Sequence, residues 1–205
     1  LLRELDLAPA HVVGASMGGM IAQTLAAERT ELVRSLTSIM STTGSRWRGQ
    51  PAIGVYRYLL GKPPRTRDEA VERAAQIFGI VGSKGLHDLE RVREVAGRSY
   101  DRGYNRAGGA LQLGAILASG NRTERLRRIT APTLVIHGTR DKLIKPSGGR
   151  ATAKAIPGAR LLRIEGMGHD LPRPLWPRLL DAIADHAHAA DRAAGGRGRE
   201  PASVA

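Results

Sequence analysis

The chain has 205 residues, of which 41% are hydrophobic, and carries a formal net charge of +13 at pH 7. This length suits one domain with an inserted lobe, and no apolar run reaches the roughly 18 residues of a membrane-spanning helix. The lack of cysteine excludes disulfides, a thiolate nucleophile and cysteine-ligated metal. It leaves the compartment open; we expect a cytoplasmic protein, any signal peptide lying upstream of Leu1.

The positive charge does not by itself indicate a nucleic-acid partner. Arginine supplies 27 of the 32 basic residues, and these are scattered along the chain. Two denser groups, at 122–128 and at Arg197 with Arg199, lack interleaved aromatic residues and any recognised binding motif. We therefore interpret both groups as solvated surface and expect no nucleic-acid partner.

The chain opens with an alternation of helical and strand-like segments. Residues 1–8 have the pattern of the end of an amphipathic helix. Residues 11–15 form a short apolar run that predicts a buried strand, and 17–27 have helical composition. The segment 32–40 is rich in strand-favouring residues and predicts a second strand.

Residues 43–128 have helical patterns and no strand-like segments. Amphipathic patterns predict helices at 67–81 and 88–100, and 107–120 is a third helical candidate. No convincing strand pattern lies among them. A helical block between strand-bearing segments predicts an inserted lobe.

Beyond this block the alternation resumes. We expect strands at 131–138 and 159–166, with helices at 148–156 and 174–191. The glycine- and arginine-rich residues 191–205 are expected to be disordered. Strands that alternate with helices predict an α/β fold, with a mostly parallel sheet and crossover helices on its faces.

A glycine-rich turn lies where the first predicted strand gives way to a helix. Residues 14–18, Gly-Ala-Ser-Met-Gly, fit the pattern Gly-x-Ser-x-Gly. Such a turn strains Ser16, and we expect side chains at Gly14 or Gly18 to crowd neighbouring backbone. The N–H of Met17 would face a developing oxyanion. A simple tight turn is the alternative; a phosphate-binding loop would need a different spacing and a lysine.

A serine nucleophile needs a base and a group that orients the base. Asp141 and His169 each follow a predicted strand, so we expect both at the carboxyl edge of the sheet together with Ser16. Asp170 adjoins His169 but would point elsewhere. The remaining histidines are expected to be structural or solvated, and none pairs with another at metal-binding spacing; they are His11, His87, His137, His186 and His188.

Three segments resemble the blocks that carry the catalytic triad in the α/β-hydrolase superfamily. They read VVGASMGGMIAQTLA, PTLVIHGTRDKLI and GMGHDLP, and their order along the chain is the order expected for that superfamily. The resemblance implies Ser16 as nucleophile, Asp141 as orienting acid and His169 as general base. It implies no cofactor and no metal.

The resemblance also implies a domain organisation. The hydrolase core would comprise 1–42 and 129–190, a helical cap would comprise 43–128, and 191–205 would be the tail. Within the superfamily, LTSIMSTTG (36–44) resembles a group of bacterial esterases that includes aclacinomycin methylesterase. We therefore expect an esterase whose partner is a small-molecule ester. C–C bond or lactone hydrolysis, acyl transfer, cofactor-free peroxidation and a non-catalytic relative stay open as alternatives.

One departure from the superfamily pattern concerns the start of the chain. Members have several strands before the nucleophile strand, and a loop among them supplies the second oxyanion donor. No such residues precede 11–15 here. We expect these N-terminal strands to be missing from this chain, which would leave it poorly active or misfolded on its own.

Overall fold

A single parallel sheet organises the molecule, as the computed structural model of residues 1–196 shows. The strands are β1 (Ala10–Ala15), β2 (Val33–Ile39), β3 (Thr133–Gly138) and β4 (Arg160–Ile164). They pair in the order β1-β2-β3-β4, and every pair is parallel. The α/β fold with a parallel sheet is therefore confirmed. All four carboxyl ends meet at one edge, which is the edge that the sequence associates with chemistry.

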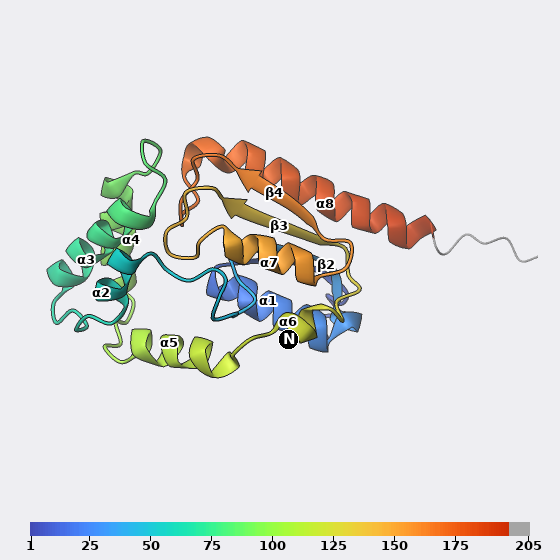
Figure 1. Cartoon of the computed structure of the whole chain (residues 1–205), viewed down its shortest axis with the longest axis horizontal. Coiled ribbons are helices and arrows are strands. Elements are labelled where there is room, and N and C mark those ends of the chain that lie inside the picture. The colour runs from blue at the N-terminus through green and yellow to red at the C-terminus, as the bar shows by residue number, and fades with distance from the viewer. Residues whose placement is uncertain (197–205) are drawn as a thin grey trace, which may run out of the picture.

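Helices cover the two faces of this sheet (Figure 1). Helix α1 (Met17–Glu28) crosses from β1 to β2 and is followed by a 3₁₀ turn at Thr30–Leu32. Helix α7 (Ser147–Ala155) crosses from β3 to β4 on the same face. The long helix α8 (Trp176–Gly196), preceded by a 3₁₀ turn at Arg173–Leu175, lies against the other face.

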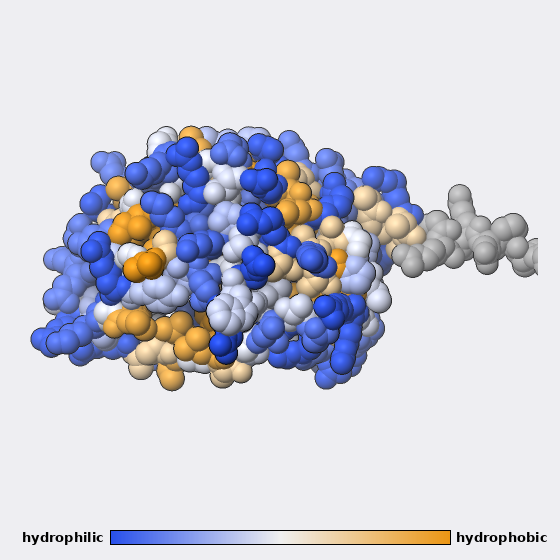
Figure 2. Space-filling view, viewed as in Figure 1, coloured by the Kyte–Doolittle hydropathy of each residue, from blue (hydrophilic) through white to orange (hydrophobic). Residues whose placement is uncertain are grey.

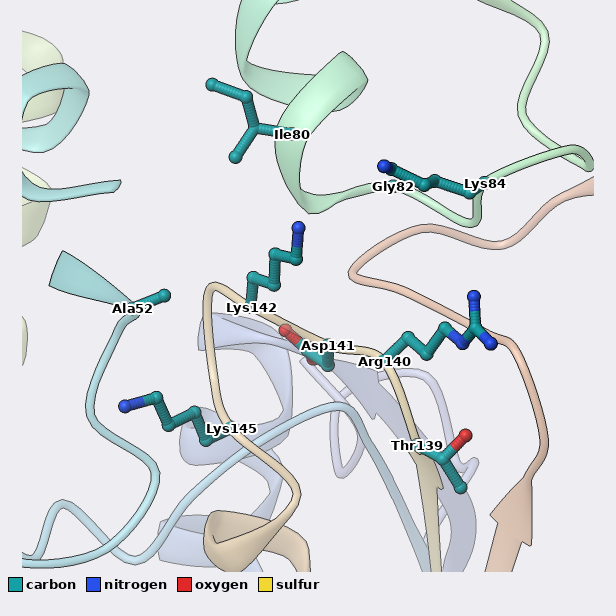
Figure 3. Close-up of a pocket in the computed structure, with 9 residues that line it drawn as sticks. All are labelled: Ala52, Ile80, Gly82, Lys84, Thr139, Arg140, Asp141, Lys142 and Lys145. Carbon is teal, nitrogen blue, oxygen red and sulfur yellow. The ribbon is translucent and has the colours of Figure 1, made fainter. Parts of the chain in front are cut away.

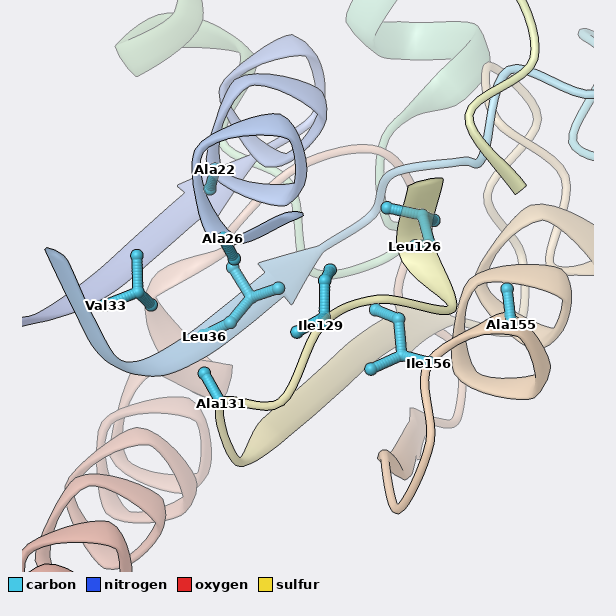
Figure 4. Close-up of a cluster of buried hydrophobic side chains, with 9 residues drawn as sticks. All are labelled: Ala22, Ala26, Val33, Leu36, Leu126, Ile129, Ala131, Ala155 and Ile156. Carbon is cyan, nitrogen blue, oxygen red and sulfur yellow. The ribbon is translucent and has the colours of Figure 1, made fainter. Parts of the chain in front are cut away.

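Two clusters of buried aliphatic side chains hold these layers together. On the α1 and α7 face, Leu36 of β2 packs with Ala26 of α1 and Ile156 beyond α7 (Figure 4). On the α8 face, Ile136 and Ile164 pack with Leu179. Burying such side chains removes apolar surface from water, so the two clusters fix the sheet between its helices.

A group of helices forms a lobe beside the sheet, at the left of Figure 1. They are α2 (Tyr56–Leu59, preceded by a 3₁₀ turn at Ile53–Val55), α3 (Arg67–Val81), α4 (Leu89–Asp101) and α5 (Gly108–Ser119). Side-chain N-caps start the two longest: the Thr66 hydroxyl accepts from the N–H of Glu69, and the Asp88 carboxylate accepts from that of Arg91.

Four details differ from the sequence predictions. Strand β1, expected to be buried, is half exposed, and Val13 is 49% exposed. Residues 1–8 form turns rather than the end of a helix. Helix α8 continues to Gly196, so 191–196 are helical and not disordered; 197–205 lie outside the described residues. Helix α6 (Thr123–Leu126) contributes Leu126 to the α1 and α7 cluster, so the part of 43–128 that contains α6 packs with the core.

In the described part of the chain, no helix combines the length and apolarity that a bilayer span requires.

Arg122 joins the two segments that connect the lobe to the sheet. Its backbone N–H donates to Thr43 O at 2.7 Å, its Nη2 donates to Thr42 O at 2.9 Å, and its Nη1 donates to Ser119 Oγ at 2.9 Å. The residue is 1% exposed, so its assignment to a solvated surface is wrong. Burial, and then the charge of Arg125, lower the pKa of Arg122.

Replacing Arg122 with Ala should lower the free energy of unfolding by about 2–3 kcal/mol, because the change leaves the Thr42 carbonyl unpaired and opens a cavity. Arg128→Ala, at an exposed neighbour, should stay within about 0.5 kcal/mol of wild type. Urea unfolding measures both variants. Equal stabilities would show that Arg122 does not hold the two segments.

Candidate active site

Ser16 lies at the junction between β1 and α1 with φ 53° and ψ −118°, a backbone conformation that L residues rarely adopt. Hydrogen bonds hold it there. Its N–H donates to Ile39 O at 2.9 Å, and its carbonyl accepts from Ser41 Oγ at 2.9 Å and from the N–H of Met20 at 3.2 Å. The turn is therefore as sharp and strained as the Gly-x-Ser-x-Gly pattern predicts.

The glycines around Ser16 are not equivalent. A Cβ at Gly14 would lie 2.2 Å from Gly18 O, so a side chain has no room there. A Cβ at Gly18 would meet no described atom within 4 Å, and the expected crowding at that position is wrong. The second crowded position is Gly19, where a Cβ would lie 2.7 Å from Ser41 Cβ. Sequence reasoning missed Gly19, which directly follows the motif, because the contact comes from Ser41 in the chain after β2.

Three side chains from distant parts of the sequence meet at the carboxyl edge of the sheet. His169 Nε2 lies 2.9 Å from Ser16 Oγ, and His169 Nδ1 lies 2.8 Å from Asp141 Oδ2. Since a carboxylate only accepts, Nδ1–H donates to Asp141, and Nε2 is left to accept from the hydroxyl. Asp141 and His169 are 2% and 7% exposed, so water barely screens this hydrogen-bonded line.

The carboxylate of Asp141 is held by more than His169. The N–H groups of Leu143 and Ile144 donate to its Oδ1 at 2.9 Å and 2.8 Å. Burial would raise the pKa of Asp141, but hydrogen bonds from His137, His169 and the backbone outweigh burial and lower that pKa below its usual range. Asp141 therefore stays ionised beside the imidazole.

His137 lies in β3, as expected of a structural residue, and its role there is specific. Its Nε2 donates to Ile144 O at 2.8 Å and lies 3.5 Å from Asp141 Oδ2. A Cβ at Gly149 would come within 2.4 Å of His137 Nδ1, so the ring needs that glycine. Sequence reasoning did not find this contact, because it depends on how the turn after β3 folds back toward His137.

The other histidines lie away from Ser16. His11 pairs with Ser35 Oγ and Asp191, and His186 Nε2 contacts two backbone carbonyls. His87 Nδ1 contacts a carbonyl in the lobe. Asp170 points away from the His169 ring, as expected, and binds Ser83 instead. Within residues 1–196 no cluster of His, Asp and Glu has the geometry to hold a metal ion.

An apolar cavity of about 680 Å³ lies between α1 and α5. Met17, the residue after Ser16, lines it together with Met20 and Ile21 of α1 and Leu111 and Ile116 of α5. Helix α5 also presents apolar side chains outward: Leu111 and Leu117 are 67% and 71% exposed, and Figure 2 shows an orange patch over this helix. This cavity places apolar volume directly beside the serine turn.

A second cavity, of about 360 Å³, lies between the end of α3 and the loop that carries Asp141 (Figure 3). Lys142 rises into it from the core loop, and Lys84 extends from the lobe segment. Arg140 and Lys145 complete a basic lining, in which Asp141 is the one acidic residue. The field in this cavity therefore favours negatively charged groups.

Comparisons with known proteins agree with this arrangement. A family model described as the alpha/beta hydrolase fold matches residues 1–172. The chain belongs to the α/β-hydrolase family. The family resemblance expected from the sequence is confirmed, and it extends through the segments that carry Ser16, Asp141 and His169.

Individual α/β-hydrolases are similar to this chain in sequence and structure. Rhodomycin D methylesterase DnrP of Streptomyces peucetius is 29% identical over 203 residues, which cover 88% of this chain and 67% of that protein. The structure of Rv0554 from Mycobacterium tuberculosis matches with TM-score 0.62 and 27% identity, covering 90% of this chain and 66% of that one. The enol-lactonase of Burkholderia xenovorans LB400 shares the fold, with TM-score 0.68 and 19% identity, covering 90% of this chain and 68% of that one. The chain spans about two thirds of the length of these relatives.

Two single-residue changes test the packing of the serine turn. Gly14→Ala should destabilise the protein by about 1–3 kcal/mol, because its methyl group would overlap the Gly18 carbonyl. Gly18→Ala should be neutral or stabilising by up to about 1 kcal/mol, since alanine favours the helix and meets open space. Thermal unfolding compares the two, and an equal loss from both would contradict the described packing.

The lowered pKa of Asp141 gives a stability that depends on pH. A depressed carboxyl pKa stabilises the folded state above the unfolded value, near 3.8, and this stabilisation is lost as pH falls through the folded pKa. The stability difference between wild type and Asp141→Asn should therefore be steady above about pH 5 and shrink as pH falls below about 3.8. A difference that stays constant in urea unfolding over this range would contradict the ionised, hydrogen-bonded carboxylate.

Proposed function

We propose that this chain carries the catalytic machinery of a serine hydrolase that cleaves a carboxylic ester of a small molecule through an acyl-enzyme. The observation that carries the proposal is the continuous line from Ser16 Oγ through the His169 ring to Asp141, with contacts of 2.9 Å and 2.8 Å. This is the arrangement that a serine hydroxyl needs to act as a nucleophile at neutral pH. The relation to a methylesterase favours an ester as the bond that is cleaved.

In the first half of the reaction, Ser16 Oγ attacks the ester carbonyl while His169 Nε2 takes its proton. Asp141 accepts from Nδ1–H, keeps the ring in the required tautomer and stabilises the imidazolium. The negative charge on the tetrahedral oxygen faces the N–H of Met17. That N–H is at the first position of α1, where no helical carbonyl competes for it and the helix dipole favours an anion.

In the second half, His169 returns the proton to the leaving alcohol and the Ser16 ester remains. The same Nε2 then takes a proton from water, which attacks the acyl carbon, and the proton passes back to Ser16 as the acid leaves. Each step moves one proton through one nitrogen. The burial of His169 and Asp141 keeps competing water from that path.

The α1–α5 cavity is the proposed site for the apolar part of the ester. It begins at Met17 and is walled by the aliphatic side chains of α1 and α5. Its volume of about 680 Å³ lies in the range of small-molecule binding sites. In this proposal the lobe acts as a cap that roofs the substrate, with α5 as its contact helix.

Lactone hydrolysis is the second candidate, because the chemistry at the carbonyl is the same and the enol-lactonase shares the fold. A panel of p-nitrophenyl esters, methyl esters and lactones distinguishes the two. Esters turned over at least tenfold faster than lactones would support the esterase. The reverse order would replace it with a lactonase without changing the proposed roles of Ser16, His169 and Asp141.

Labelling with a fluorophosphonate tests the nucleophile directly. Wild-type protein, expressed as its gene encodes it, should label at one serine, and Ser16→Ala should not label at all. Asp141→Asn should label more slowly by about 10³–10⁴-fold, because the imidazole loses its orienting acceptor. Ser99→Ala, at an exposed serine of the lobe, should label like wild type. A folded wild-type protein that resists labelling, or labels elsewhere, would reject the serine hydrolase.

A further inference from the structure

A buried serine of the lobe contacts the loop that carries His169. Ser83 lies two residues after the end of α3 and is 0% exposed. Its hydroxyl donates to Asp170 Oδ1 and accepts from the N–H of Gly168 at 2.8 Å. Its backbone N–H donates to the same carboxylate, at 3.0 Å from Oδ1 and 3.1 Å from Oδ2. One lobe residue thus binds both neighbours of His169.

The residues beside Ser83 complete this contact. The N–H of His169 itself donates to Val81 O at 2.7 Å. Gly168 has no room for a side chain, because a Cβ there would lie 2.4 Å from both Val81 O and Gly82 C. Three consecutive residues, 168–170, are therefore each hydrogen-bonded to the segment 81–83 of the lobe.

The lobe side of the contact is itself fixed. The carbonyl of Ser83 accepts from His87 Nδ1 at 2.7 Å and from the backbone N–H groups of Leu86 and His87. These bonds close the turn that leads toward α4. Ser83 is therefore a rigid point of the lobe, and the His169 loop is bound to that point rather than to a loose connection.

We propose that Ser83 and Asp170 are positioning residues, which hold the His169 ring in line with Ser16 by tying its loop to the lobe. The proposal rests on the proposed function. It adds that the same contacts that dock the lobe on the core also align the His169 ring with Ser16. Imidazole alignment tolerates little error: a displacement of about 1 Å at a reacting group can cost on the order of 10²-fold in rate. The side chain of Asp170 acts only through the loop, since it points to Ser83 and not to the imidazole.

The test uses the protein as its gene encodes it, with fluorophosphonate labelling and the turnover of p-nitrophenyl acetate. Ser83→Ala and Asp170→Ala should each lower kcat and the labelling rate by about 10–10²-fold, with KM changed less than threefold. Asp170→Asn should recover most of the rate, because its Oδ1 can still accept from both donors of Ser83. If Asp170→Ala lowered the rate only by removing the negative charge, Asp170→Asn would lower it equally, because it removes the same charge.

Thr66→Ala is the matched control. It removes the N-cap at the opposite end of the same helix, α3, where the hydroxyl accepts from Glu69 at 3.2 Å. This change weakens the lobe without touching the His169 loop, so kcat should stay within twofold of wild type. If Thr66→Ala lowers kcat as much as Ser83→Ala at an equal fall in melting temperature, the effect is general destabilisation and the positioning role is overturned.

The outcomes separate this proposal from the proposed function. Folded Ser83→Ala and Asp170→Ala variants with wild-type kcat and labelling would overturn the positioning role, while loss of labelling in Ser16→Ala would still support the hydrolase. If Asp170→Ala fails to fold, the kcat and labelling rate of Ser83→Ala are compared with those of Asp170→Asn. Equal, wild-type values in both variants would overturn the positioning role. Labelling that persists in Ser16→Ala would instead overturn the hydrolase, whatever Ser83 does.

Discussion

Because all four strands pair in parallel, each one ends at the same edge of the sheet, and the chain must turn there before it returns. Those turns bring together Ser16, Asp141 and His169, which are up to 153 residues apart. No local interaction could hold them together. Their alignment depends on the register between neighbouring strands, for example Gly14 opposite Ser38 and Ile39 opposite Ile136. A slip in either pairing would also turn buried side chains toward solvent, so the two aliphatic clusters protect the register.

The strained backbone of Ser16 illustrates how the fold sustains a locally unfavourable conformation. A residue of this kind costs about 1–3 kcal/mol. Hydrogen bonds from Ser41 and to Ile39, together with close packing at Gly14 and Gly19, leave no relaxed alternative. The neighbouring N–H of Met17 lies at the start of α1, where no helical carbonyl accepts from it. Strain and anion-binding geometry therefore have one origin.

Sequence reasoning succeeded where the signal was local. The Gly-x-Ser-x-Gly turn, the strands before Asp141 and His169 and the helix at 67–81 are all read from adjacent residues. It failed where the cause lies elsewhere in the chain. The burial of Arg122 depends on two segments that meet only in the fold, the crowding at Gly19 comes from Ser41, and Ser83 contacts a loop more than 80 residues away. The open space at Gly18 likewise depends on what packs against α1, which no motif encodes.

The two segments that connect the lobe to the sheet meet at Gly44, Gly120 and Arg122, and this close approach affects how the fold can vary. Gly44 and Gly120 approach so closely that a Cβ on Gly44 would lie 2.1 Å from Gly120 O, and Arg122 bridges the same two segments. The sheet therefore spans a short gap between β2 and β3, whatever the length of chain that loops out between those glycines. Adding or removing residues in that loop changes the closure entropy only slowly. The lobe can be remodelled by insertion and deletion while the strand register of the sheet stays unchanged.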